Sequence, residues 1–126
     1  MYSNGYNIYK NNSINFASKE QLLLMLTDGL VKFSKIGRQA IKDKDIQKAN
    51  DSLKRAQSIF SELMVSLDTN TGEWAKNLYN IYAYIKERLF DANMQKSVEI
   101  MDEIIPLIED INNMWHEAYK QSIKNR

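Results

Sequence analysis

The sequence predicts an all-α protein, an antiparallel four-helix bundle with an N-terminal arm. From residue 22 onward, four stretches place apolar residues at alternating steps of three and four, which keeps them on one side of a helix. Short polar segments separate the stretches, and connections of that length favour antiparallel neighbours. Each stretch is long enough for about five helical turns or more, so the predicted helices can pack along most of their length.

The first predicted helix covers residues 18–42. Ser18 followed by Gln21 is a capping-box pattern, in which each side chain bonds the backbone of the other residue at a helix start. Gly29 lies on the apolar side, where a glycine lets a neighbouring helix or side chain approach closely. The apolar positions are Leu22, Leu26, Gly29, Phe33, Ile36 and Ala40.

The second predicted helix covers residues 46–67 and follows Asp45, a residue type that caps helix N-termini. The turn-forming residues 68–72 separate it from the third helix. The apolar positions of the second helix are Ile46, Ala49, Leu53, Ala56, Phe60, Leu63 and Leu67.

The third and fourth predicted helices cover residues 73–94 and 98–122. Ser97 can cap the fourth helix, and Pro106 inside it is expected to bend the axis because proline removes one backbone hydrogen bond. Their apolar positions are Leu78, Tyr82, Ile85, Leu89 and Ala92, then Met101, Ile104, Ile108, Ile111, Trp115 and Ala118.

Residues 1–17 form the predicted arm and show no sustained helical pattern. The composition, rich in asparagine with Lys10 as the one charged residue, fits a flexible terminus. Disordered segments are poor in aromatic residues, however, and this one is not. Its apolar residues could therefore dock reversibly on the bundle; they are Tyr2, Tyr6, Ile8, Tyr9, Ile14 and Phe16.

Composition excludes several classes of protein. A chain of 126 residues has the size of one domain, here the bundle of residues 18–126. The absence of cysteine excludes disulfides and thiolate sites and fits a reducing compartment. No segment has the pattern of a signal peptide or a membrane span. The 17 basic and 16 acidic residues are interspersed, so we expect a cytoplasmic protein with no membrane insertion and no nucleic-acid partner.

Few residues could support catalysis or hold a metal ion. His116 is the only histidine and lacks the Glu-x-x-His spacing of helical metal sites, so it is expected on the surface. The Asp28-Gly29 pair lacks the glycine-rich run of a phosphate loop. Asp102 and Glu103 would need an apolar pocket to separate their pKa values for acid-base work. The sequence therefore predicts no enzyme, no metal ion and no cofactor.

Apolar residues outside the four stripes exceed what a bundle core requires. Such a surplus favours a groove for an amphipathic helix or an extended chain, and methionines such as Met25, Met64 and Met94 would let the groove adapt. The alternative is that these residues belong to a wide hydrophobic core, with a few apolar side chains exposed as is normal on a protein surface. The surplus residues are Leu23, Leu24, Leu30, Val31, Ile59, Met64, Val65, Tyr79, Ile81 and Tyr84.

Particular sequence boxes then resemble the FliS family of flagellar export chaperones, in order and over nearly the whole chain. Lys19, Thr27 and Phe16 stand where this family usually has proline, tyrosine and threonine. The matching segments are Ile14-Asn15-Phe16-Ala17-Ser18, Gln21-Leu22, Met25-Leu26-Thr27-Asp28-Gly29, Leu53-Lys54-Arg55-Ala56-Gln57, Glu62-Leu63, Ser66-Leu67-Asp68, Arg88-Leu89-Phe90, Ala92-Asn93 and Trp115.

The resemblance implies a four-helix bundle that binds the disordered C-terminal segment of flagellin in the cytoplasm and prevents premature polymerisation. It also implies delivery of the complex to the export gate of the flagellar secretion apparatus. With the apolar surplus, it implies a set of flagellin-binding residues: Tyr6, Ile8, Tyr9, Ile14, Met25, Leu30, Tyr79, Tyr82, Leu89 and Asn93.

Two alternatives to an export chaperone stay open at this point. One is a regulatory or self-associating bundle that binds another amphipathic helix; the expected state of the chain itself is a monomer or weak dimer. The other is a small cofactor-binding or ferritin-like helical enzyme, which would carry a bound metal ion or chromophore when purified.

Overall fold

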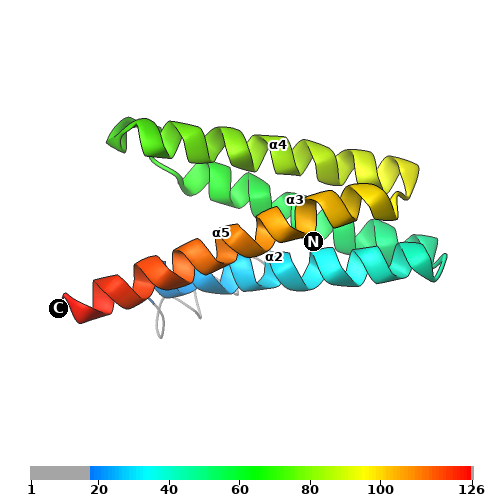
Figure 1. The fold of residues 1–126 in the computed structure, drawn as a ribbon, viewed down its shortest axis with the longest axis horizontal. Coiled ribbons are helices and arrows are strands. Elements are labelled where there is room, and N and C mark those ends of the chain that lie inside the picture. The colour runs from blue at the N-terminus through cyan, green and yellow to red at the C-terminus, as the bar shows by residue number, and fades with distance from the viewer. Residues whose placement is uncertain (1–17, 126) are drawn as a thin grey trace.

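The computed structural model describes residues 18–125, and the predicted arm lies outside this range (Figure 1). Four long helices follow one another: α2 (Lys19–Lys42), α3 (Ile46–Ser66), α4 (Glu73–Gln95) and α5 (Val98–Lys124). A 3-10 turn, η1 (Thr69–Thr71), precedes α4. The predicted all-α four-helix bundle is confirmed, and the helix ends differ from the predicted ones by at most two residues. None of the described helices is long and apolar enough to cross a bilayer.

The sequence-predicted helix caps are present at the starts of α2, α3 and α5. The Ser18 hydroxyl accepts from the Gln21 backbone N–H at 3.2 Å, and Gln21 Oε1 accepts from the Ser18 N–H at 2.9 Å. The Asp45 carboxylate accepts from the Lys48 N–H, and the Ser97 hydroxyl caps α5 in the same way. Each cap satisfies a backbone donor that the helix itself leaves without a partner, which fixes where the helix begins.

The four helices are arranged so that each packs against two others. Helices α2 and α4 both contact α3 and α5, so α2 lies diagonally opposite α4 and α3 opposite α5. The short connections make consecutive helices antiparallel. Figure 1 shows α4 and α5 close together at the turn that joins them and farther apart toward the end labelled C. The α4–α5 pair is also the most loosely packed of the four neighbouring pairs.

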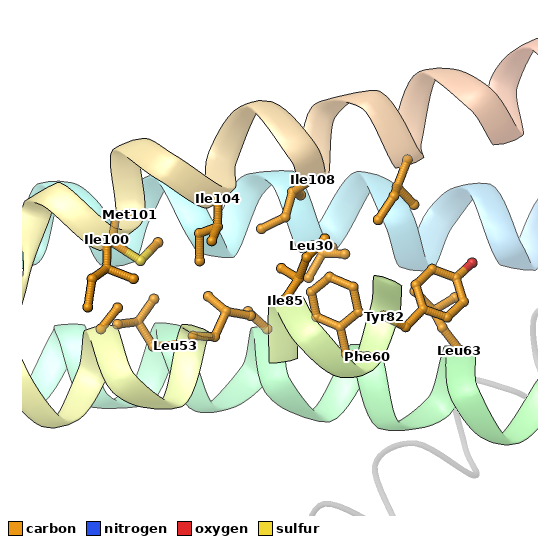
Figure 2. Close-up of a cluster of buried hydrophobic side chains, with 14 of the residues drawn as sticks. Leu30, Leu53, Phe60, Leu63, Tyr82, Ile85, Ile100, Met101, Ile104 and Ile108 are labelled. Carbon is orange, nitrogen blue, oxygen red and sulfur yellow. The ribbon is translucent and has the colours of Figure 1, made fainter. Parts of the chain in front are cut away.

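The predicted apolar stripes of the second, third and fourth helices meet in one continuous core. The stripe predicted for the first helix is wrong: of its positions only Ala40 is buried, because packing against α3 and α5 turns another side of α2 inward. The other residues that α2 buries are Leu24, Thr27, Leu30, Ser34, Gly37 and Ile41. Figure 2 shows Leu30, Ile85 and Ile108, from three different helices, pointing into the same interior. The rings of Phe60 and Tyr82 lie 5.9 Å apart at 56°, a tilted arrangement that aromatic pairs favour. Ten large apolar side chains are fully buried, and all come from the four helices: Leu30, Leu53, Phe60, Leu63, Tyr82, Ile85, Leu89, Met101, Ile104 and Ile108.

The glycine at the close helix contact is Gly37, and the prediction that Gly29 has this role is wrong. A Cβ added at Gly29 would lie 3.5 Å from Ile59 Cδ1, an ordinary van der Waals distance. A Cβ at Gly37 would lie 2.8 Å from Leu53 Cγ and closer still to Leu53 Cδ2. Helices α2 and α3 therefore pack tightly at Gly37, beside a leucine that is itself fully buried.

Pro106 lies inside α5, as the sequence shows, on the exposed side of the helix. A proline deprives the carbonyl four residues earlier, here that of Asp102, of its helical partner. Because Asp102 is also exposed, water can bond this carbonyl, and the helix continues for several turns. The bend itself stays a prediction.

Candidate functional site

Exposed apolar side chains are concentrated on α4. Among residues 18–125, twelve large apolar side chains are exposed, and six of them belong to this one helix. Single exposed apolar residues are normal on a protein surface, whereas a concentration on one element indicates a binding surface. The six are Trp74, Tyr79, Ile81, Tyr84, Phe90 and Met94.

One side of α4 borders a shallow hollow against α3. Tyr79 lies one turn before Ala83, so the two residues share this side of the helix. Phe90 is 53% exposed and offers its ring to a ligand. The hollow has a volume of about 510 Å³ and is lined by Gln57 and Met64 of α3 and by Ala83, Lys86, Glu87 and Phe90 of α4.

The other side of α4 faces α5, as the 2.9 Å ion pair between Arg88 and Glu103 shows. Ile81 and Tyr84 precede Arg88 by seven and four residues and therefore share its side of α4. On α5, Leu107 and Met114 follow Glu103 by four and eleven residues and therefore share its side of that helix. We call these four exposed residues the α4–α5 apolar face: Ile81, Tyr84, Leu107 and Met114. The two α5 residues were not expected from the sequence, although their spacing from Glu103 is visible in it.

Two large aromatic side chains bridge α4 and α5 where the helices diverge. The Trp115 indole Nε1–H donates to the Tyr82 hydroxyl at 2.9 Å. Tyr82 is fully buried and Trp115 partly buried. Burial raises the pKa of Tyr82, and the hydrogen bond from Trp115 offsets this only in part. The hydrogen bond therefore links α4 directly to α5.

Four of the predicted flagellin-binding residues lie in the interior. Leu30, Tyr82 and Leu89 are in the core, because their helical positions point toward the other three helices, and Asn93 is 8% exposed. A ligand on the surface of this conformation does not reach their side chains, and their contact with the client stays a prediction. Leu24 and Leu30 were also expected in the surface surplus, and this interpretation is corrected because both are buried.

Met25 and Tyr79 are the described members of the predicted set that reach the surface, with 42% and 37% exposure. They lie on different helices, α2 and α4, which are diagonal to each other. The remaining predicted contacts, Tyr6, Ile8, Tyr9 and Ile14, fall outside the described residues. The two placed residues therefore do not form one site.

Asn93 has a structural contact instead. The Lys96 ammonium donates to Asn93 Oδ1 at 2.8 Å and to Asn50 Oδ1 of α3 at 2.7 Å. Lys96 itself ends α4 in the left-handed conformation, with φ of 50°. These bonds hold the end of α4 against α3, so Asn93 stabilises the turn before α5.

A polar network joins α2 and α5 at the Met25–Gly29 box. The Asn112 amide donates to Asp28 Oδ1 at 2.8 Å and to the Thr27 hydroxyl at 3.0 Å. His116 Nε2 lies 2.7 Å from the same Asp28 oxygen. Thr27 is fully buried, and its hydroxyl donates to the Leu24 carbonyl. His116 is partly exposed, but its partner is on another helix, which spacing along one helix could not reveal.

The electrostatics of Asp28 predict a weak acid sensitivity. Partial burial alone would raise the pKa of Asp28, but the hydrogen bonds from His116 and Asn112 and the charge of His116 bring it below 3.8. A carboxyl whose pKa falls on folding stabilises the protein above its unfolded pKa, and the contribution is lost as the pH drops through the folded pKa. We expect Asp28→Asn to lower the free energy of unfolding by less than about 1 kcal/mol at neutral pH.

This difference should shrink as the pH falls below about 4. Urea unfolding at several pH values measures it, with Asp110→Asn as the control for an exposed α5 carboxylate. A deficit that stayed constant down to pH 2 would contradict the assignment.

The neighbouring carboxylates Asp102 and Glu103 face different helices. Asp102 pairs with Arg38 of α2, and Glu103 pairs with Arg88 of α4. The hydrogen bond from Arg38 lowers the pKa of Asp102. The two carboxylates therefore position α5 between its neighbours and do not converge on a shared site. Within residues 18–125, no group of three or more acidic or histidine side chains is arranged to hold a metal ion.

Charge is not evenly distributed along the chain, which corrects the expectation of interspersed charges. Residues 31–55 contain eight basic and three acidic residues, a net charge of +5. Residues 56–125 contain six basic and eleven acidic residues, a net charge of −5. The basic segment covers the second half of α2, the turn and the first half of α3. A balanced total thus conceals a basic region at one end of the α2–α3 pair.

Comparisons with known proteins agree on one family. A sequence model described as "Flagellar protein FliS" matches residues 2–122. The chain is 32% identical over 123 residues to the flagellar secretion chaperone FliS of Bacillus subtilis (strain 168), covering 98% of this chain and 92% of that protein. It is 33% identical over 104 residues to the flagellar secretion chaperone FliS of Escherichia coli (strain K12), covering 81% and 76%.

A solved structure has a similar fold. It is described as "Crystal structure of flagellar chaperone from bacteria" and aligns with a TM-score of 0.74 over 96% of this chain and 99% of that one. At 16% sequence identity, this likeness supports the helical fold alone.

Proposed function

This chain belongs to the FliS family of flagellar secretion chaperones, and we propose that it binds the disordered C-terminal segment of flagellin in the cytoplasm. The bound segment cannot polymerise prematurely, and the complex is delivered to the export gate of the flagellar secretion apparatus. The chaperone acts as a monomer or weak dimer, needs no cofactor and catalyses no reaction.

The observation that carries this proposal is the apolar surface of α4. This helix faces the core with one side only, yet six large apolar residues are exposed on its other sides. The hollow beside α3 and the α4–α5 apolar face lie on two flanks of the same helix, so a chain that crosses α4 contacts both. A ligand that wraps round the bundle uses such divided surfaces, whereas a small compact ligand would need one enclosed pocket.

A disordered client suits this surface energetically. A segment that folds on binding buries about 1,000–3,000 Å² and loses a few kcal/mol to its own ordering. The complex is then stable enough to prevent polymerisation and weak enough per unit area to be released at the export gate. The client contacts that we propose outside the core are Met25 and Tyr79, with Tyr6, Ile8, Tyr9 and Ile14 of the arm.

Isothermal titration calorimetry with a peptide of about the last forty residues of the organism's flagellin tests the proposal. We expect one-to-one binding with a dissociation constant of about 1 μM or lower. The heat-capacity change should be strongly negative because apolar area is buried. A peptide from the flagellin N-terminus, matched in length, is the control. No binding of the C-terminal peptide would contradict the export-chaperone function.

A self-associating or regulatory bundle is the second candidate, favoured by the same exposed apolar residues. Sedimentation at low micromolar concentration separates the two. A dimer that dissociates when flagellin peptide is added would indicate that self-association and flagellin binding use the same surface. A tight dimer that neither binds the peptide nor dissociates in its presence would favour self-association.

A further inference from the structure

Among the described residues, the α2–α3 pair presents several cations that make no ion pair with a carboxylate. Of the eight basic residues in the segment 31–55, Lys35 and Arg38 pair with Glu109 and Asp102 of α5. No ion pair within residues 18–125 involves the other six: Lys32, Lys42, Lys44, Lys48, Lys54 and Arg55.

Three of these cations lie on the side where α2 and α3 meet. Lys32 Nζ lies 5.8 Å from the centre of the Phe33 ring, and the Arg55 guanidinium lies 5.3 Å from it, so one ring of α2 holds a cation from each helix. Lys48 precedes Arg55 by seven residues and shares its side of α3. We call Lys32, Lys48 and Arg55 the basic face; all three are exposed.

Two positive charges on one ring repel each other, and nearby anions would lower that energy. Asp51 lies on the turn of α3 between Lys48 and Arg55 but makes an ion pair with neither. The other acids of the segment are engaged locally, since Asp45 caps α3 and Asp43 accepts from Gln39. An anionic partner therefore has three cations within reach, and Asp51 is the one acid of the segment that stands among them without a local bond of its own.

The same helix pair is apolar at its opposite end. A hollow of about 450 Å³ lies between the start of α2 and the end of α3, and Val65 on its rim is 84% exposed. Between the hollow and the basic face, the half-buried Ile59 side chain of α3 packs beside Gly29 of α2. The hollow is lined by Lys19, Leu22, Leu23, Leu26, Glu62, Val65 and Ser66.

We infer that the α2–α3 pair binds an amphipathic segment of the flagellin client, with its apolar residues over the hollow and its acidic residues over the basic face. The inference rests on the proposed function and adds the chemistry and direction of one client segment. Along α3, Glu62 and Ser66 at the hollow lie 14 and 18 residues from Lys48, so a client helix of about that length spans both regions. Charge at one end and apolar contact at the other allow one orientation only.

Charge reversal on the basic face tests the inference. In the full chain, Lys32→Glu with Arg55→Glu should weaken binding of the C-terminal flagellin peptide about tenfold in low salt. The parent should lose a similar factor between about 50 and 500 mM NaCl, and the variant should show almost no salt dependence. The matched control, Lys120→Glu with Lys124→Glu, makes the same charge change at two exposed positions near the end of α5 and should bind like the parent.

A flagellin peptide with its acidic residues changed to lysine should bind the reversed variant more tightly than it binds the parent. Equal binding by parent and variant, each confirmed as folded by circular dichroism, would overturn the inference and leave the proposed function intact. If the parent itself does not bind the peptide, the proposed function fails instead. Equal losses in the variant and the control would show a general effect of net charge and would also overturn the inference.

Discussion

Replacing Gly37 with valine is expected to lower the free energy of unfolding by about 3 kcal/mol. A Cβ at this position would lie 2.8 Å from Leu53 Cγ and closer still to Leu53 Cδ2, and valine adds two methyl groups beyond the Cβ. Leu53 is fully buried and surrounded by core residues, so it has no free volume into which to move. Helices α2 and α3 would have to separate, and the midpoint of thermal unfolding should fall by roughly 10 °C.

Alanine at Gly29 is the matched control on the same helix. Its Cβ would make an ordinary contact with Ile59, 3.5 Å away, while removing a glycine from a helix interior. We expect this variant to gain about 0.5–1 kcal/mol. Differential scanning calorimetry of both variants decides the point. If both lost stability equally, tight packing at Gly37 would not be the cause.

Aspartate at both Ile81 and Tyr84 is expected to weaken binding of the flagellin peptide by about a hundredfold. These side chains are 47% and 49% exposed, so the substitutions leave the core unchanged. In the complex, each aspartate would place an unpaired charge in an apolar contact, which costs more than the lost contact alone. Isothermal titration calorimetry measures the change, and thermal unfolding of the free variant should stay within about 1 kcal/mol of the parent.

The control for this prediction changes two other exposed isoleucines to aspartate, Ile46 at the start of α3 and Ile123 near the end of α5. The net charge change is the same, and neither residue belongs to the α4–α5 apolar face. We expect the control to bind within about threefold of the parent. If the control lost as much affinity as the test variant, the flagellin segment would not be held by the apolar residues of α4.

The two flanks of α4 and the α2–α3 pair lie on different sides of the bundle. A client that uses both must wrap round the molecule, and its two halves then bind as linked segments with a high effective concentration. Loss of one contact region weakens the complex without abolishing it. Charge reversal on the basic face should therefore change mainly the salt dependence of peptide binding. The α4 substitutions should change mainly the heat-capacity change of binding.

The helices and their caps can be predicted from the sequence alone, because both depend on neighbours three or four residues away. Ser18, Asp45 and Ser97 cap their helices as their spacing predicts. The core stripes of α3, α4 and α5 were equally accessible: Leu53, Phe60 and Ile85 follow the helical period and are fully buried. The apolar stripe of α2 was not, because this helix has apolar residues on more than one side. The motifs shared with FliS also lie in the linear sequence, so the family can be inferred from the order of the residues alone.

Which side of each helix meets which partner depends on the packing of all four helices. Gly37 is critical because α3 brings Leu53 against it, and His116 has a partner because α2 brings Asp28 beside it. Tyr82 and Asn93 were predicted to contact the client but face inward, since the direction of a wide apolar stripe is set by the other three helices. The basic face likewise exists only because the antiparallel pairing of α2 and α3 places Arg55 beside Phe33. Contacts between residues far apart in sequence depend on packing, which helical periodicity alone does not specify.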